Sequence, residues 1–149
     1  MEHRTVWIVL ADGEHARFVT PAPKRAFHTQ RVLDSPSAHL QSVDLGTDRP
    51  PRSMESATGI RHAITPKHDL HEMEKRKFAH QVAHEINRAS AQEAFDHVVL
   101  VAPAHTLNEI RNELDATTAA KLIGSLQKDL IKVPDHELAP HLNEWVLQD

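Results

Sequence analysis

The chain has 149 residues, a formal net charge of −4, 40% apolar and 26% charged residues, and no cysteine. This composition is ordinary for one globular domain with a real core, and the absence of cysteine excludes disulfides, thiolate nucleophiles and cysteine-ligated zinc. The apolar run near the N-terminus, Val6–Ala11, is too short for a signal-peptide core or a membrane span. We therefore expect a single cytoplasmic domain over residues 1–149 that makes no contact with a membrane.

Three runs of apolar and β-prone residues open the chain, at Val6–Ala11, Ala16–Thr20 and Ala26–Leu33. The first run is apolar on both faces, which predicts a central strand covered on each side. Asp12-Gly13 follows it, and this dipeptide is typical of a type I′ hairpin turn with positive φ at both central positions. Pro21 and Pro23 should then break the chain before the third strand. The three runs together predict an antiparallel meander.

Residues 37–68 show no periodicity and are predicted to form a long loop. Asp69 and Glu72 have capping-box spacing, which predicts a helix from Asp69 to about Glu93. Apolar residues recur along it at helical spacing, at Phe78, Val82, Ile86 and Ala89. The longest helix should therefore pack one continuous stripe across the sheet.

The remaining patterns predict a strand, two helices, a further strand and a final helix, at His97–Ala102, Thr106–Leu114, Asp115–Leu122, Ile123–Ile131 and Asp135–Trp145. Thr106 and Glu109 have capping-box spacing, and Asp115 can cap the second helix. A strand that passes into a helix is typical of a parallel α/β unit. The predicted fold class is α/β, with a mixed sheet of about five strands and helices packed on it.

Residues Arg49–Phe78, here called the basic segment, differ in charge from the rest of the chain. They hold seven Lys/Arg and four Asp/Glu, which gives the segment a formal charge of +3. Since the whole chain has a formal charge of −4, the residues outside the segment carry −7. The negative total argues against nucleic-acid binding over the whole surface, but this segment can contact phosphate groups. The residues predicted to bind an anionic partner are Arg49, Arg52, Arg61, His62, Lys75 and Arg76. The alternative is a solvated segment whose charges are balanced by acidic neighbours.

Thirteen histidines invite a metal-site interpretation. His62, His68 and His71 lie beside Asp69 and Glu72, and such a set suits zinc or manganese. Alternatively, the two carboxylates cap the helix and the histidines line a surface. His80 and His84 have the spacing by which two imidazoles reach one zinc ion, but Gln81 stands where the zincin pattern needs glutamate. Both should face solvent, opposite the apolar stripe.

A third candidate site is a carboxylate set for two-metal nuclease chemistry, formed by Asp12, Asp44 and Asp48. The Asp-Gly turn explains Asp12 equally well. The sequence contains no Gly-x-Ser-x-Gly, P-loop or dinucleotide-binding pattern.

Several segments, taken in order, resemble the bacterial host attachment protein family. They are VWIVLADGEHARFV, DLGTDRPPRSMESATGIRHAI, HDLHEMEKRKFAHQVA, VVLVAP and the later KDL. The resemblance covers nearly the whole chain and implies one small α/β domain. The family name comes from an attachment phenotype, so no biochemical activity is implied.

That family is similar in turn to the central domain of archaeal and eukaryotic peptide-chain release factors, in which a Gly-Gly-Gln loop precedes a long helix. Here the corresponding loop is Thr58–Ala63, with one glycine and no following glutamine, and the helix contains Arg76-Lys77-Phe78. The resemblance therefore implies the fold and an affinity for ribosomal RNA or tRNA, but not peptidyl-tRNA hydrolysis. Arg61 and His62 would stand at the loop tip.

Three hypotheses follow. In the first, the protein is a non-catalytic binding module without a cofactor that contacts RNA, the ribosome or another anionic partner through residues Arg49–His71. In the alternative, it is a metal-dependent hydrolase that uses His62, His68 and His71 with zinc or manganese. In the third hypothesis, the protein is a direct adhesin, but the sequence shows no export signal.

Overall fold

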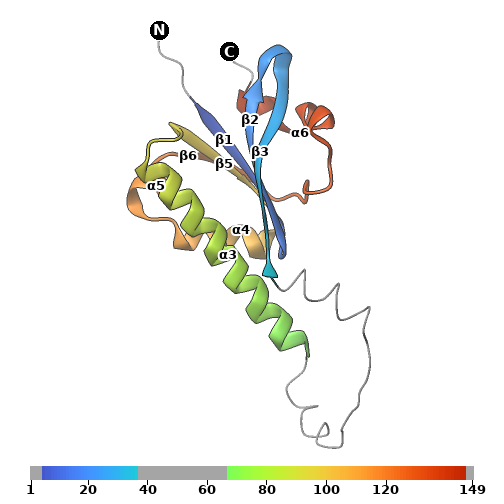
Figure 1. Ribbon diagram of the computed structural model, residues 1–149, viewed down its shortest axis with the longest axis vertical. Coiled ribbons are helices and arrows are strands. Elements are labelled where there is room, and N and C mark those ends of the chain that lie inside the picture. Colours follow the sequence, from blue (N-terminus) through green and yellow to red (C-terminus); the bar gives the residue numbers. More distant parts are fainter. Residues whose placement is uncertain (1–4, 37–66, 147–149) are drawn as a thin grey trace, which may run out of the picture.

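A five-stranded mixed sheet runs through the molecule in the order β3-β2-β1-β5-β6 (Figure 1). The computed structural model describes residues 5–36 and 67–146. In chain order the elements are β1 (Val6–Ala11), β2 (His15–Ala22), η1 (Pro23–Arg25), β3 (Ala26–Asp34), α3 (Lys67–Ala91), β5 (His97–Val101), α4 (Ala104–Glu113), α5 (Ala116–Ala120), β6 (Leu122–Leu126), η2 (Asp135–Glu137) and α6 (Ala139–Val146). The predicted α/β class and five-stranded mixed sheet are confirmed.

The strand order places β1 at the centre of the sheet. It pairs antiparallel with β2, which pairs antiparallel with β3, so the predicted meander is confirmed. On its other side β1 pairs parallel with β5, and β5 pairs parallel with β6. The chain therefore leaves β1 toward one edge of the sheet, and leaves β5 toward the other.

The turn between β1 and β2 differs from the type I′ expectation. The Asp12 N–H donates to the His15 carbonyl at 2.9 Å, which makes Gly13 and Glu14 the central residues. No glycine in the described part of the chain has positive φ. Instead, Asp12 Oδ1 accepts hydrogen bonds from the backbone N–H groups of Glu14 and His15, at 2.8 and 2.7 Å. This side-chain acceptor holds the turn without left-handed backbone.

Pro21 does not end the second strand, contrary to expectation. It lies within β2 opposite Phe27 of β3. The pairing of β1 with β2 extends only as far as Val19, so no strand on the other side needs an N–H from Pro21. The chain turns at Pro23, which begins η1.

Both faces of the sheet are covered, as predicted for β1. One face of the sheet packs under α3 and α4, through Val9, Phe18, Val98, Leu100, Phe78, Val82, Ile86, Leu107 and Ile110. The other face packs under the C-terminal segment, through Ile8, Leu10, Val19, Val99, Val101, Leu130, Leu138 and Leu142. Side chains that alternate along β1 therefore enter two different core layers.

The long helix α3 carries the predicted apolar stripe. Phe78, Val82, Ile86 and Ala89 are all at most 8% exposed. The helix begins at Lys67, so Asp69 falls in its first turn and not at the N-cap. The sequence pattern therefore placed the start of the helix two residues too late.

Helix α4 also starts earlier than predicted. Pro103 is its N-cap, and no side chain caps it, so Thr106 and Glu109 do not form a capping box. Proline has extended backbone here (φ −60°, ψ 154°), which allows the helix to begin directly after β5. By contrast, Asp115 caps α5 as predicted. The Thr118 N–H bond to its carboxylate lowers the pKa of Asp115.

The predicted last strand and helix are both shorter. The strand β6 ends at Leu126, and the single predicted helix is divided into η2 and α6. Pro140 lies in the first turn of α6, where its missing N–H is harmless; inside one continuous helix it would remove a hydrogen bond.

Arg17 fixes the segment between β6 and α6 on the sheet. Its guanidinium donates to three backbone carbonyls, those of Leu130, Ile131 and Val133, at 3.2, 2.8 and 2.6 Å. It also contacts Asp135 at 2.6 Å. Burial raises the pKa of Asp135, but the hydrogen bonds from Thr29 and Arg17 outweigh this effect and lower it. We call the contacts of Arg17, Thr29 and Asp135 the arginine clasp.

Candidate functional site

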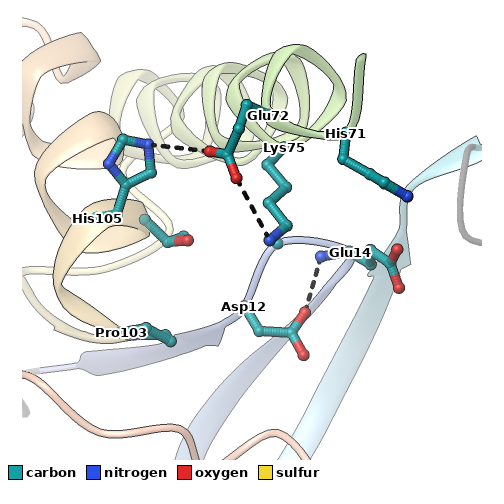
Figure 2. A pocket seen from close by; sticks show the side chains of 9 residues that line it. Asp12, Glu14, His71, Glu72, Lys75, Pro103 and His105 are labelled. Atoms are coloured by element: carbon teal, nitrogen blue, oxygen red, sulfur yellow. Dashed lines mark hydrogen bonds and ion pairs between the residues drawn. The ribbon is translucent and has the colours of Figure 1, made fainter. Parts of the chain in front are cut away.

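An open pocket of about 590 Å³ lies where β1 and β5 end (Figure 2). Three parts of the chain line it: the β1–β2 turn, the first turns of α3 and the start of α4. The lining residues are Asp12, Gly13, Glu14, His71, Glu72, Lys75, Pro103, His105 and Thr106.

The sheet topology explains why the pocket lies at this edge. Because β1 and β5 are adjacent and parallel, their carboxyl ends meet there. After β1 the chain turns toward β2, whereas after β5 it enters α4 and continues toward β6. In open α/β sheets, ligands bind outside the carboxyl ends of strands at such a point of divergence. The pocket therefore has the position expected of a ligand site.

Lys75 of α3 lies against the β1–β2 turn. A Cβ atom added to Gly13 would be 2.8 Å from Lys75 Cγ, so glycine is what allows the lysine stem to lie this close. The Lys75 ammonium is 3.9 Å from Glu72 Oε2, and Glu72 Oε1 is 3.9 Å from His105 Nε2. Figure 2 shows Glu72 between these two side chains. Both contacts are longer than a hydrogen bond, so the lysine can still bind a ligand.

The start of α4 supplies hydrogen-bond donors. The first bond within this helix runs from the Leu107 N–H to the Pro103 carbonyl, so the N–H groups of residues 104–106 precede it. No side chain caps them. Thr106 lines the pocket, although only 8% of the residue is exposed.

The residues predicted to bind an anionic partner are only partly visible. Arg49, Arg52, Arg61 and His62 lie outside the described residues, as does the tip of the predicted loop. Lys75 lines the pocket. Arg76 is 53% exposed and faces α4, where its Nε is 3.8 Å from Glu109. The two described members of the set therefore lie on neighbouring sides of α3.

The predicted metal sites gain no support in the described residues. His71 lines the pocket and has other contacts, whereas His62 and the side chain of His68 lie outside the described part. No three His, Cys, Asp or Glu side chains within residues 5–36 and 67–146 are grouped to hold a metal ion. Asp44 and Asp48, proposed with Asp12 as nuclease carboxylates, also fall outside.

The expectation for the histidine pair on α3 was half right. His84 is exposed. His80 does not face solvent fully, because α4 packs beside it. Its Nε2 is 3.3 Å from Glu109 and 3.6 Å from Glu113. The apolar stripe correctly predicted which side of α3 is buried. It could not predict that α4 packs beside α3 near His80.

Sequence reasoning missed Glu14 and His105 as pocket residues and assigned Thr106 to a helix cap. A signal for them was present: each follows closely on a predicted strand, and the ends of adjacent parallel strands meet at one edge. The pairing of β1 with β5 was not predicted, so the two strand ends were never placed together.

The fold and the pocket define a small α/β domain with an open pocket at one edge of its sheet, beside its longest helix. Comparison with protein families gives a specific assignment. Residues 7–142 match the family described as protein required for attachment to host cells, and the chain belongs to that family. The resemblance stated from the sequence motifs is thus confirmed. No curated protein matches the chain.

Among solved structures, the chain is similar to the crystal structure of the archaeal translation termination factor aRF1. The TM-score is 0.55 at 12% identity, with 96% of this chain and 35% of the factor covered. A structure titled "Archaeal protein" matches with a TM-score of 0.46 and 11% identity, over 94% of this chain and 36% of that one. The release-factor-like fold is therefore confirmed, and the chain spans about a third of the factor's length. Within the described residues, no helix has the length and apolar character needed to cross a membrane.

Proposed function

We propose that the protein is a non-catalytic binding module whose partner is RNA, contacted through the basic segment. The observation that carries this proposal is the charge distribution: +3 within residues Arg49–Phe78 and −7 elsewhere. A cationic stretch on an acidic body directs an anionic partner to one part of the surface.

The described end of the basic segment supports the proposal. Arg76 and Lys77 are 53% and 70% exposed. Their nearest carboxylates lie at 3.8 and 3.6 Å, too far for a hydrogen bond. Exposed ion pairs of this kind contribute little stability, so exchanging a carboxylate for a phosphate costs little. In Figure 1 the first turns of α3 extend past the sheet, where a large partner can reach them.

The fold is similar to that of an archaeal translation termination factor, and this similarity guides the choice of RNA to test. We therefore expect ribosomal RNA or tRNA, or the ribosome itself, as the partner. The protein would act by binding, because the Thr58–Ala63 loop lacks the glutamine on which release-factor hydrolysis depends.

The test is RNA binding measured over a range of salt concentrations. The Arg52→Ala/Arg61→Ala variant should bind more weakly, and the slope of log affinity against log salt should fall by about 1 to 2 units, as expected for two lost phosphate contacts. The matched control, Arg88→Ala/Arg111→Ala, removes two exposed arginines outside the basic segment and should leave the slope unchanged. Equal binding by all three proteins would refute the proposal.

The alternative, a metal-dependent hydrolase, can be tested by measuring the metal content of the protein. The protein should be purified without a nickel column, and its zinc and manganese content determined by elemental analysis. Zinc or manganese at one equivalent, lost on substitution of His71, would favour a metal enzyme over a binding module.

A further inference from the structure

Helices α3 and α4 meet along a line of ionisable side chains that bond across the helix pair. On each helix these residues are four positions apart, so they lie on one face of it. The six residues, here called the α3–α4 seam, are Glu72, Arg76 and His80 of α3 and His105, Glu109 and Glu113 of α4. The end of the seam nearest the pocket is visible in Figure 2, where Glu72 Oε1 is 3.9 Å from His105 Nε2.

His80 contacts two carboxylates of the seam. Its Nε2 is 3.3 Å from Glu109 Oε1 and 3.6 Å from Glu113 Oε2. Arg76, one turn earlier on α3, reaches the other oxygen of Glu109, with its Nε 3.8 Å from Oε2. The Glu109 side chain is only 23% exposed, less than any other in the seam, so solvent screens its charge least. Glu109 is therefore shared between a permanent cation and a titratable imidazole.

Within the described residues, no other charged side chain lies at ion-pair distance from His80. Helix α5 contains no ionisable side chain, and the core beneath α3 is apolar. On α3 itself, Lys77 pairs with Glu74 at 3.6 Å, and Glu85 pairs with Arg31 of β3 at 3.0 Å. The charge state of His80 therefore acts first on the two carboxylates of α4.

Protonation changes the formal charge of the seam. With both imidazoles neutral, three carboxylates face one guanidinium and the formal charge is −2; with both protonated it is zero. Histidine is the side chain that ordinarily changes charge between about pH 5 and 8. The Arg76 side chain is 53% exposed, so the charge around it decides how strongly it attracts an anion. An anion that approaches Arg76 therefore meets less repulsion in mildly acidic solution.

We propose that the α3–α4 seam is a pH-sensitive switch that strengthens the RNA contact of Arg76 as the pH falls. Protonated His80 compensates the charge of Glu109 and Glu113, and Glu109 then competes less with an RNA phosphate for the guanidinium. This inference rests on the proposed RNA contact and adds its regulation.

The test is the affinity of the full chain for bulk tRNA at about pH 7.5 and about pH 5.5, at one ionic strength. Because other histidines also titrate, the quantity to compare between proteins is the ratio of the two affinities. His80→Gln should bind like the wild type at the higher pH and about two- to fivefold more weakly at the lower pH, the range of one exposed ion pair. The matched control is His84→Gln, at an exposed histidine one turn further along α3, and it should keep the wild-type ratio.

A second variant tests the opposite sign. Glu109→Gln removes the carboxylate that competes for Arg76, so it should raise tRNA affinity about two- to fivefold at the higher pH and reduce the pH response. Glu137→Gln removes the same charge from an exposed glutamate of η2 that also lies beside a histidine, at 3.4 Å, and should leave affinity and ratio unchanged. Thermal unfolding at both pH values checks that each variant is folded.

The outcomes separate the switch from the RNA contact itself. A wild-type ratio in both His80→Gln and Glu109→Gln would overturn the switch, while the Arg52/Arg61 experiment would still decide the RNA contact. If tRNA is not bound at either pH, the proposed function fails, and elution from heparin, a polyanion without bases, decides the switch. Elution of His80→Gln at lower salt than the wild type, at the lower pH alone, would support it; equal elution would overturn it.

Discussion

At the scale of single residues, Asp12 shows how one carboxylate supports two interpretations. It was a candidate for metal binding and for the hairpin turn. The structure assigns one of its oxygens, Oδ1, to the turn, because this atom accepts hydrogen bonds from both Glu14 and His15. The carboxylate thus replaces the left-handed backbone that the Asp-Gly pattern suggested.

Substitution at Asp12 separates the acceptor from the charge. Asp12→Ala leaves two backbone N–H groups without their partner and should lower the free energy of unfolding by about 1 to 2 kcal/mol. Asp12→Asn keeps an oxygen acceptor at the same position and should cost less than half as much. Urea denaturation measures both. Equal destabilisation by the two variants would show that the charge, and not the acceptor, stabilises the turn.

At the scale of elements, the sequence predicted what local pattern determines. The strands β1, β2, β3 and β5 and the buried stripe of α3 follow from apolar periodicity, which the core then uses directly. Element starts were less predictable: Pro103 begins α4 without a side-chain cap, and Pro140 divides the last predicted helix. These boundaries depend on backbone geometry that hydrophobic pattern does not encode.

The pocket could not be predicted from the sequence for a different reason. Its residues come from three stretches far apart in the chain, and only the parallel pairing of β1 with β5 brings them together. Lys75 and His71 were selected from the sequence for their charge and residue type. His105 and Thr106 can be recognised as pocket residues only once the fold places them near Lys75 and His71. Long-range strand pairing is the information that a single sequence lacks.

The arginine clasp makes stability depend on pH. The folded-state pKa of Asp135 lies below its ordinary value of 3.8, so its contribution is fully present above that pH and is lost as the pH falls below it. Asp135→Asn should lower the free energy of unfolding by about 1 kcal/mol at neutral pH, a figure that allows for solvent screening. The difference in free energy of unfolding between wild type and variant should narrow as the pH falls below 3.8. A gap that is independent of pH would contradict the assigned role of the ionised carboxylate.

At the scale of the whole molecule, the sheet is stable only because both of its faces are covered. The helices α3 and α4 cover one face, and the segment from Leu130 to Leu142 covers the other. Among the described residues, the layer of α3 and α4 lines the pocket and the C-terminal layer does not, so the C-terminal layer supports the sheet without taking part in the pocket. Damage to either layer should therefore affect folding, whereas damage to the C-terminal layer should leave ligand contacts intact.

This distinction can be measured with two truncations of buried side chains. Ile86 and Leu142 are both fully buried, one under each face of the sheet. Ile86→Ala and Leu142→Ala should each lower the free energy of unfolding by about 2 to 5 kcal/mol, a large share of the 5 to 15 kcal/mol typical of a domain. RNA binding by the folded fraction should stay unchanged in Leu142→Ala, because this side chain lies across the sheet from α3. A small cost in only one variant would show that the corresponding layer is dispensable, and the sheet would then rest on a single layer.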